Sequence, residues 1–388
     1  MKRSRVEVYL LGLLAGGLLA GCTAGPVEEI VPEESRPVTL SFGKPDLGVP
    51  ELLTRSGEAV SPAPTPLPPG TTVRIGAYFT GDVGGELQEA GFATTEPSFE
   101  ATYVVGDDGG LSPCLVDADG KQVEGEAGGM IVRGGVYDFY AVSPARSLQK
   151  EADGSYKITG IPHKEDVMSS FVRGVAVTKD ARRVTLGTFR RKCAMVVFNV
   201  SPSSENALPF EKLYGTSLVI KKISSSGASL IAGCDTGILP TGGSEGAEAE
   251  VRFSEDEFEP VEAESDPDKS GLNKTKGVVL PKNGQAFDVE ISVVRDDKTA
   301  TLKATIDKNI SFDEGKRYIF TLEVKNSESA LLMKVLDWNA IVFTDDNVGG
   351  PPDGGYPDPD INEGIGTTVT VAQWKEIQWS GNGEIGGK

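Results

Sequence analysis

Short runs in which apolar and polar residues alternate cover most of the chain between residues 71 and 345. Every second residue of the run 73–79 is apolar, which is the pattern of a strand with one buried face. The strongest apolar run covers 184–201, and glycine-rich turns such as 106–110 separate one run from the next. Short strands punctuated in this way predict an all-β protein built of β-sandwiches.

Two breaks in this pattern divide the chain into domains. Five prolines lie within 56–70, so this segment cannot be a central strand and is expected to be a linker. The polar sequence 180–183 interrupts two strand-rich blocks, and a length of 388 residues fits about two domains. We therefore expect an N-terminal domain at 71–180 and a C-terminal domain at 181–345.

One strand-like pattern precedes the proline-rich linker. Val38, Leu40 and Phe42 alternate with polar residues, as in a strand that buries one face. The strand 37–42 is therefore expected to complete the N-terminal domain, although the linker separates it from the rest of that domain.

A second isolated apolar segment lies near the C-terminus. Residues 345–364 are mostly Asp, Gly and Pro and predict a flexible linker, so 346–388 is expected to be a linker followed by a strand. The strand segment, 367–379, has no obvious core of its own; its apolar residues are Val369, Val371, Trp374, Ile377 and Trp379. The alternation breaks after Val371, which predicts a bulge or turn near 372–374.

The N-terminus has the features of an export signal. Three basic residues precede an apolar run at 8–19, which is too short to span a bilayer but suits a signal peptide. The run ends in Leu19-Ala20-Gly21-Cys22, which resembles the lipobox of bacterial lipoproteins. That resemblance implies that 1–21 is removed, that Cys22 is acylated, and that a lipid holds the chain on the outer membrane at the cell surface.

Charge narrows the choice of partners. The formal net charge of −19 repels phosphate backbones, so we expect no nucleic-acid partner. The stretch 244–274 is especially acidic and is expected to be an exposed loop.

The remaining cysteines give no metal-binding pattern. Cys114, Cys193 and Cys234 form an odd set without the close spacing of zinc ligands. We favour small buried side chains for all three, and a Cys193–Cys234 disulfide stays open because only geometry can decide it.

Catalytic motifs are missing from the sequence. The single histidine, His163, follows a proline in a polar turn and is interpreted as a solvated loop residue. The chain contains no GxSxG, HExxH or Walker sequence. The acidic run 358–363 places Glu363 where an EF-hand loop needs glycine. We therefore expect no enzyme activity, no cofactor and no metal site.

Aromatic residues in 135–144 have two interpretations. Tyr137, Phe139 and Tyr140 could form a platform for sugars, or they could pack in the core. Alternation places Tyr137 and Phe139 on one face of a strand and Tyr140 on the other, so core packing is favoured.

Several segments together resemble the fimbrillin-like lipoproteins of Bacteroidales, the subunits of type V pili. The resemblance rests on 137–145, on the junction 174–178 with 184–200, and on the closing segments 315–322 and 335–338. It implies two tandem transthyretin-like β-sandwich domains. It also implies that an arginine-specific protease removes the first strand and that a strand from a neighbouring subunit fills the vacated groove.

The resemblance assigns roles to particular residues. Val38, Leu40 and Phe42 would form the removable strand within the N-terminal segment 22–70. Arg55 is the candidate cleavage site, and Arg36 is a weaker one because a proline follows it. The segment 367–379 would be the donated strand.

Alternatives to these roles stay open. Arg55 could be an ordinary loop residue, and the tail could fold back on its own second domain. The chain could also be a pilus tip or anchor component, or a lipid-anchored surface protein that binds glycans through Trp374 and Trp379. The expected partners are other pilus subunits, the outer membrane through the lipid, and a host or bacterial surface ligand.

Overall fold

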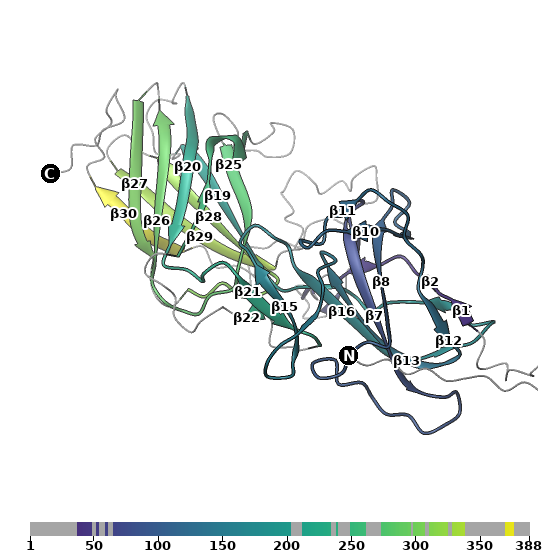
Figure 1. Cartoon of the computed structure of the whole chain (residues 1–388). Helices are drawn as coiled ribbons and strands as arrows, with labels where there is room; N and C mark the ends of the chain where they lie inside the picture. The colour runs from purple at the N-terminus through teal and green to yellow at the C-terminus, as the bar shows by residue number, and fades with distance from the viewer. Residues whose placement is uncertain are drawn as a thin grey trace, which may run out of the picture.

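The structure is a computed structural model, and it describes residues 37–48, 52–53, 59–60, 65–202, 212–233, 238–239, 249–260, 273–295, 298–306, 310–324, 328–337 and 369–375. Apart from one short 3-10 turn, Glu255–Glu257, the elements in these ranges are strands, which confirms the all-β fold class. They form two β-sheet bodies that meet near the middle of the molecule (Figure 1). Among the described residues, no helix is long and apolar enough to cross a membrane.

The N-terminal body contains one large antiparallel sheet. Its strands, in order across the sheet, are β18 (Arg190–Arg191), β16 (Met168–Val177), β13 (Gly135–Ser143), β7 (Thr72–Gly81), β8 (Phe99–Val105) and β9 (Leu111–Pro113). A second layer contains β12 (Ile131–Arg133), β1 (Pro37–Thr39), β2 (Ser41–Phe42) and β17 (Arg183–Val184). A small hairpin of β10 (Leu115–Val116) and β11 (Gln122–Val123) flanks them.

Strand β13 is the centre of the large sheet, and both of its faces are buried. Tyr137 and Phe139 belong to the core between the two layers, whereas Tyr140 and Val142 belong to a different cluster on the opposite face. All four side chains are at most 2% exposed, so they are core residues and not a sugar platform. The first position of β13 needs glycine, because Gly135 has a φ of +153° and a Cβ there would lie 2.5 Å from the ring of Phe79.

The C-terminal body is a sandwich of two sheets. One sheet has the order β24 (Phe258–Pro260), β25 (Asn273–Val279), β19 (Ala194–Pro202), β28 (Lys316–Val324), β29 (Glu328–Asp337) and β30 (Val369–Lys375). The other has the order β23 (Glu250–Phe253), β20 (Leu213–Lys221), β26 (Phe287–Arg295) and β27 (Lys298–Ile306). Alternate residues of β19, β26 and β28 fill the space between them, and the rings of Phe198 and Phe320 stack 4.5 Å apart.

The two bodies share a sheet. Strands β14 (Gln149–Lys150) and β15 (Tyr156–Ile161) belong to the N-terminal half of the chain, and β21 (Ala228–Ile231) and β22 (Ile238–Leu239) to the C-terminal half. Because β15 pairs with β21, the four strands form one antiparallel sheet across the junction. An apolar cluster that contains Tyr140, Ile158, Cys193, Leu230 and Leu280 packs there.

The domain boundary lies later than the sequence pattern suggests. We expected it near residue 180, but β17 pairs with β2 and β18 pairs with β16, so both belong to the N-terminal body. The chain therefore passes from the N-terminal body to the C-terminal body after Arg191. The polar sequence 180–183 is the turn between two strands of one body.

His163 is a junction residue, which corrects its interpretation as a solvated loop residue. The backbone N–H of Leu280 donates a hydrogen bond to Nδ1 over 3.1 Å, so Nε2 carries the proton and donates to the carbonyl oxygen of Ser224 over 2.7 Å. Both partners lie in the C-terminal body. The next residue, Lys164, extends the contact through an ion pair with Glu257 and a position 4.8 Å above the ring of Phe253.

The pKa of His163 predicts a pH dependence of stability. Burial holds this pKa below its ordinary value of 6.5. As the pH falls below 6.5, the imidazole is protonated in the unfolded chain but not in the folded chain. The contribution of His163 to the free energy of unfolding is therefore fully present above pH 6.5 and decreases as the pH falls below that value. The slope is at most about 1.4 kcal/mol per pH unit for one proton. We expect urea unfolding between pH 7.5 and 5.5 to show this slope in the unaltered chain and a smaller one in His163→Gln. Equal slopes would contradict the assignment.

Candidate functional site: the N-terminal strand and its groove

The segment 37–48 occupies a groove in the second layer of the N-terminal body. On one side β1 pairs antiparallel with β12, and the backbone N–H of Leu40 donates to the carbonyl oxygen of Met130 over 2.9 Å. On the other side β2 pairs in parallel with β17. The segment is therefore the middle strand of its layer, with a different partner along each edge.

Hydrogen bonds to the second partner continue beyond β2. The N–H of Gly43 donates to Val184 over 2.8 Å, the N–H of Phe189 to Asp46 over 2.8 Å, and the N–H of Gly48 to Phe189 over 2.9 Å. Gly187 allows this partner segment, 182–189, to pack closely on the large sheet, because a Cβ there would lie 2.2 Å from the carbonyl oxygen of Phe171. If residues 37–48 left, backbone groups along both walls of the groove would lose their partners.

The strand also supplies part of the core. Val38 is 7% exposed, Leu40 5% and Leu47 4%, whereas Thr39 and Ser41 face solvent. Phe42 is half-buried, with its ring edge-on to the rings of Tyr103 and Phe139 at 5.1 and 6.0 Å. The three side chains expected to face the core do so. Burial of the four apolar side chains contributes on the order of 6–12 kcal/mol.

A buried tyrosine supports the wall that holds Leu40. The hydroxyl oxygen of Tyr103 accepts a hydrogen bond from the N–H of Met130 over 2.9 Å, and the carbonyl of Met130 accepts from Leu40. Burial raises the pKa of Tyr103, so its hydroxyl is neutral at physiological pH. This wall is therefore set by uncharged hydrogen bonds and is insensitive to pH in that range.

At the N-terminal end of the strand, the groove opens into a cleft of about 320 Å³. Val38 forms one wall, and the loops that contain Val83 and Thr178, together with Gly135 at the start of β13, form the others.

After the strand, the chain returns to the body through two short pairings. Strand β3 (Asp46–Leu47) pairs with β6 (Thr65–Pro66), and β4 (Leu52–Leu53) pairs with β5 (Ala59–Val60). Leu67, directly after β6, is 1% exposed and joins the same core as Leu40. In the sequence, Arg55 falls between β4 and β5. Arg55 itself, Arg36 and Cys22 lie outside the described residues.

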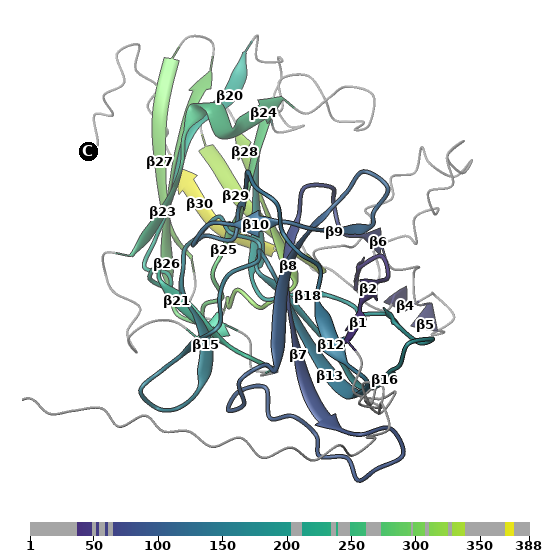
Figure 2. The same ribbon diagram turned by 45° about the vertical axis from the view of Figure 1, so that its right-hand side comes forward.

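The C-terminal segment pairs with its own body in this structure. Strand β30 lies antiparallel to β29 at the edge of the large C-terminal sheet (Figure 2). The pairing shifts register between Thr370 and Ala372, so Val371 is an extra residue in β30, just before the predicted irregularity. Val369, Val371 and Trp374 lie in β30, and Ile377 and Trp379 lie outside the described residues.

The thiols are unsuited to nucleophilic chemistry. Cys114 and Cys193 are buried and free, and Cys234 lies outside the described residues. Burial raises the pKa of Cys114, and it raises that of Cys193 to about 12. Both thiols therefore stay protonated at physiological pH. The described part of the chain also holds no group of three acidic, histidine or cysteine side chains placed to bind a metal.

Sequence patterns did not reveal the whole groove. Leu47 is isolated among Pro45, Gly48 and Pro50, so no alternation marks it. The parallel pairing of the first strand with the segment 182–189 had no local signal either, because parallel pairing joins residues far apart in the chain. The apolar residues of 184–189 were the only available sign that this segment is buried.

Comparison with known proteins is consistent with this architecture. A family model for fimbrillin-like proteins matches residues 132–338. A search of curated proteins found no match.

The solved structures that match this chain include three bacterial proteins. A proposed cell-adhesion protein of Bacteroides fragilis NCTC 9343 is 17% identical and aligns over 79% of this chain and 100% of its own, with a TM-score of 0.50. A proposed cell-adhesion protein of Bacteroides uniformis ATCC 8492 is 14% identical over 78% and 99%, with a TM-score of 0.47. A fimbrial assembly protein of Parabacteroides distasonis ATCC 8503 is 13% identical over 77% and 95%, with a TM-score of 0.35.

The first of these solved structures has the same overall fold as this chain. The family model covers more than half of the 388 residues, from strand β12 of the N-terminal body to the end of β29. On that basis the chain belongs to the fimbrillin-like family.

Proposed function

We propose that this chain is exported as a lipoprotein through Cys22, loses its first strand to an arginine-specific protease, and polymerises by strand exchange. Membership of the fimbrillin-like family makes it a pilus or adhesin subunit and a structural protein, not an enzyme. The observation that carries the proposal is the position of residues 37–48 as a middle strand with a buried apolar face.

Cleavage after Arg55 would separate β1 to β4 from the body. The strand would then be held only by non-covalent contacts, and its departure would open a groove lined by apolar side chains and unpaired backbone groups. Such a groove is a template for an added strand. The lipid on Cys22 would leave with the same fragment, so the anchor would be temporary.

The tail is proposed as the strand that fills the groove of a neighbouring copy. In its own body β30 lies at the edge of the described sheet, and β29 is its one partner among the residues that the structure describes. In the groove a strand has two partners, β12 and the segment 182–189. Transfer of the tail from its own edge to a neighbour's groove would therefore raise its number of backbone hydrogen bonds, which gives exchange a driving force.

Strand exchange predicts a direct biochemical result. Treatment of the purified chain with an arginine-specific protease is expected to give oligomers that survive SDS without boiling, because each donated strand is held along both edges. Arg55→Ala is expected to abolish the ladder, and Arg36→Ala, the matched control, to leave it intact. Removal of residues 366–388 should also abolish it. Mass spectrometry would verify the cleavage site, and complete cleavage after Arg55 without any oligomer would contradict the proposal.

The N-terminus of the surface-exposed protein distinguishes a shaft subunit from an anchor. N-terminal sequencing of material from the cell surface is expected to start at Ser56 for a shaft subunit. An anchor would keep Cys22 and the first strand. A monomeric glycan-binding lipoprotein would stay a monomer with and without protease treatment. It would lose glycan binding in Trp374→Ala and Trp379→Ala.

A further inference from the structure

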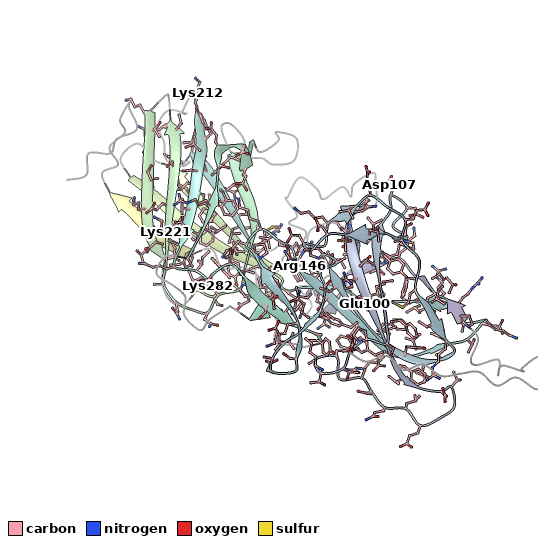
Figure 3. The ribbon with its side chains drawn as sticks, viewed as in Figure 1. Glu100, Asp107, Arg146, Lys212, Lys221 and Lys282 are labelled. Atoms are coloured by element: carbon pink, nitrogen blue, oxygen red, sulfur yellow. The ribbon has the colours of Figure 1, made fainter. Side chains whose placement is uncertain are left out.

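A second cleft, which we call the junction cleft, lies where the two bodies meet. Its volume is about 380 Å³, within the range of small-molecule sites, and domain junctions are a common place for such sites. The residues that matter for its chemistry are Ser169, Phe171, Thr188, Arg190, Lys192 and Glu314. Figure 3 shows Arg146, which lies in the same junction region.

The junction cleft holds more positive than negative charge. Arg190 is exposed in β18 and forms no ion pair with any residue that the structure describes. Lys192 is 5% exposed, and its Nζ lies 3.5 Å from Oε2 of Glu314, a long separation for a charged pair. That buried carboxylate oxygen forms no hydrogen bond within the described part of the chain. Two cations and one carboxylate leave one net positive charge in a chain whose formal charge is −19.

An aromatic ring and hydroxyl groups complete the cleft. Phe171 is 46% exposed, a large apolar side chain open to solvent next to the buried Ser170 in β16. Ser169 stands two residues before it in β16, on the same face of the strand. Thr188 is exposed on the facing segment. The lining thus combines an apolar ring, hydroxyl groups and an excess of positive charge.

We propose that the junction cleft binds a sugar unit that carries a carboxylate, as uronic acids and sialic acids do. The carboxylate pairs with the guanidinium of Arg190, whose planar fork suits two parallel hydrogen bonds, and with the ammonium of Lys192. The C–H face of the sugar ring packs on Phe171, and sugar hydroxyls exchange hydrogen bonds with Ser169 and Thr188. A monoanionic sugar neutralises the excess charge of the cleft. A neutral sugar leaves that charge in place.

This site shares Thr188 with one wall of the strand-exchange groove, but its cations and its ring lie outside the groove, so the proposal holds whether or not the chain polymerises. One residue connects the two places, because a Cβ on Gly48 of the first strand would lie 3.0 Å from the methyl group of Thr188. The uncleaved chain, with its groove filled, is therefore the material for the test.

Saturation-transfer NMR on the full uncleaved chain tests the proposal. The probes are methyl β-glucuronide and methyl α-N-acetylneuraminide, with methyl β-glucoside as the neutral control. We expect at least one acidic probe to bind with a dissociation constant of about 1 mM, a common strength for one sugar unit making a few contacts. The neutral glucoside is expected to bind at least tenfold more weakly, and added salt to weaken the acidic probe.

Variants connect any binding to the junction cleft. Arg190→Ala and Phe171→Ala are each expected to weaken the acidic probe at least tenfold. Arg182→Ala, which removes an exposed arginine from the other end of the same segment, is the matched control and should not change it. Thermal unfolding checks that the variants stay folded, as expected for exposed side chains. Absence of saturation transfer to both acidic probes, equal binding of the neutral glucoside, or unchanged binding in Arg190→Ala would each overturn the proposal.

Discussion

Replacement of Leu40 by aspartate is expected to unfold the N-terminal body under conditions in which the unaltered chain is folded. Leu40 is 5% exposed and packs in the core between the two layers. Loss of a buried leucine costs about 2–5 kcal/mol, and a carboxylate without a buried partner adds to that cost. The total, at least about 4 kcal/mol, is comparable with the entire stability of an ordinary domain.

The neighbouring residue provides the control for this prediction. Thr39 belongs to the same strand, but its side chain faces solvent, so Thr39→Asp introduces the same charge without burying it. We expect this variant to unfold within about 0.5 kcal/mol of the unaltered chain. A small shift in Leu40→Asp, equal to that in Thr39→Asp, would mean that the strand does not support the core.

The distribution of tryptophan allows the C-terminal region to be followed by itself. The three tryptophans, Trp338, Trp374 and Trp379, all lie in the C-terminal half of the chain, whereas Tyr103 and Tyr137 lie in the N-terminal core. Near-ultraviolet circular dichroism therefore reports the tyrosines of both bodies, because Tyr214 and Tyr318 lie in the C-terminal body, whereas tryptophan fluorescence reports the C-terminal region alone. We expect Leu40→Asp to change the first signal much more than the second.

Local alternation of apolar and polar residues predicted strands without any knowledge of the strands with which they pair. Val38, Leu40 and Phe42 were expected to face a core because they occupy every second position, and they do. The same rule placed Tyr137 and Phe139 opposite Tyr140. Both successes rest on the period of a strand, which depends only on the backbone of that strand.

Features that depend on distant partners were not predictable in this way. The boundary was placed too early because the polar sequence 180–183 looks like a linker, and only the pairing of β17 with β2 shows that the N-terminal body continues. His163 has polar neighbours, so its surroundings resemble a solvated turn. Its burial arises from Ser224 and Leu280, which no pattern near residue 163 could reveal.

Glu165→Gln is expected to destabilise the chain by about 3–5 kcal/mol, the cost of leaving one charge of a buried pair without its partner. Glu165 binds Arg146 through two hydrogen bonds, Nε to Oε1 over 2.7 Å and Nη2 to Oε2 over 2.6 Å. The side chains of Glu165 and Arg146 are 16% and 10% exposed, so water replaces little of the interaction that the substitution removes. Asp119 is the other acidic neighbour that the structure shows for Arg146, at 3.4 Å with a largely exposed side chain, and it compensates only in part.

The position of this pair connects its loss to the contact between the two bodies. The carbonyl oxygen of Glu165 accepts a hydrogen bond from Sγ of Cys193, and Val167 accepts one from the N–H of Lys192. Cys193 is also bound through its own carbonyl to Gly315 of the C-terminal body. A shift of the loop 165–167 therefore disturbs the point at which the chain passes from one body to the other. We expect hydrogen exchange at Lys192 and Gly315 to rise in Glu165→Gln.

A double-mutant cycle distinguishes a paired charge from simple packing at this position. Arg146→Met removes the cation and keeps most of the volume of its side chain, so it should leave Glu165 buried and unpaired. If the cost arises from unpaired charge, the double variant Arg146→Met with Glu165→Gln is expected to be more stable than the sum of the two single changes predicts, by about 1–3 kcal/mol. Strict additivity in urea unfolding would contradict the pairing. It would mean that each side chain supports the junction independently, through its apolar stem.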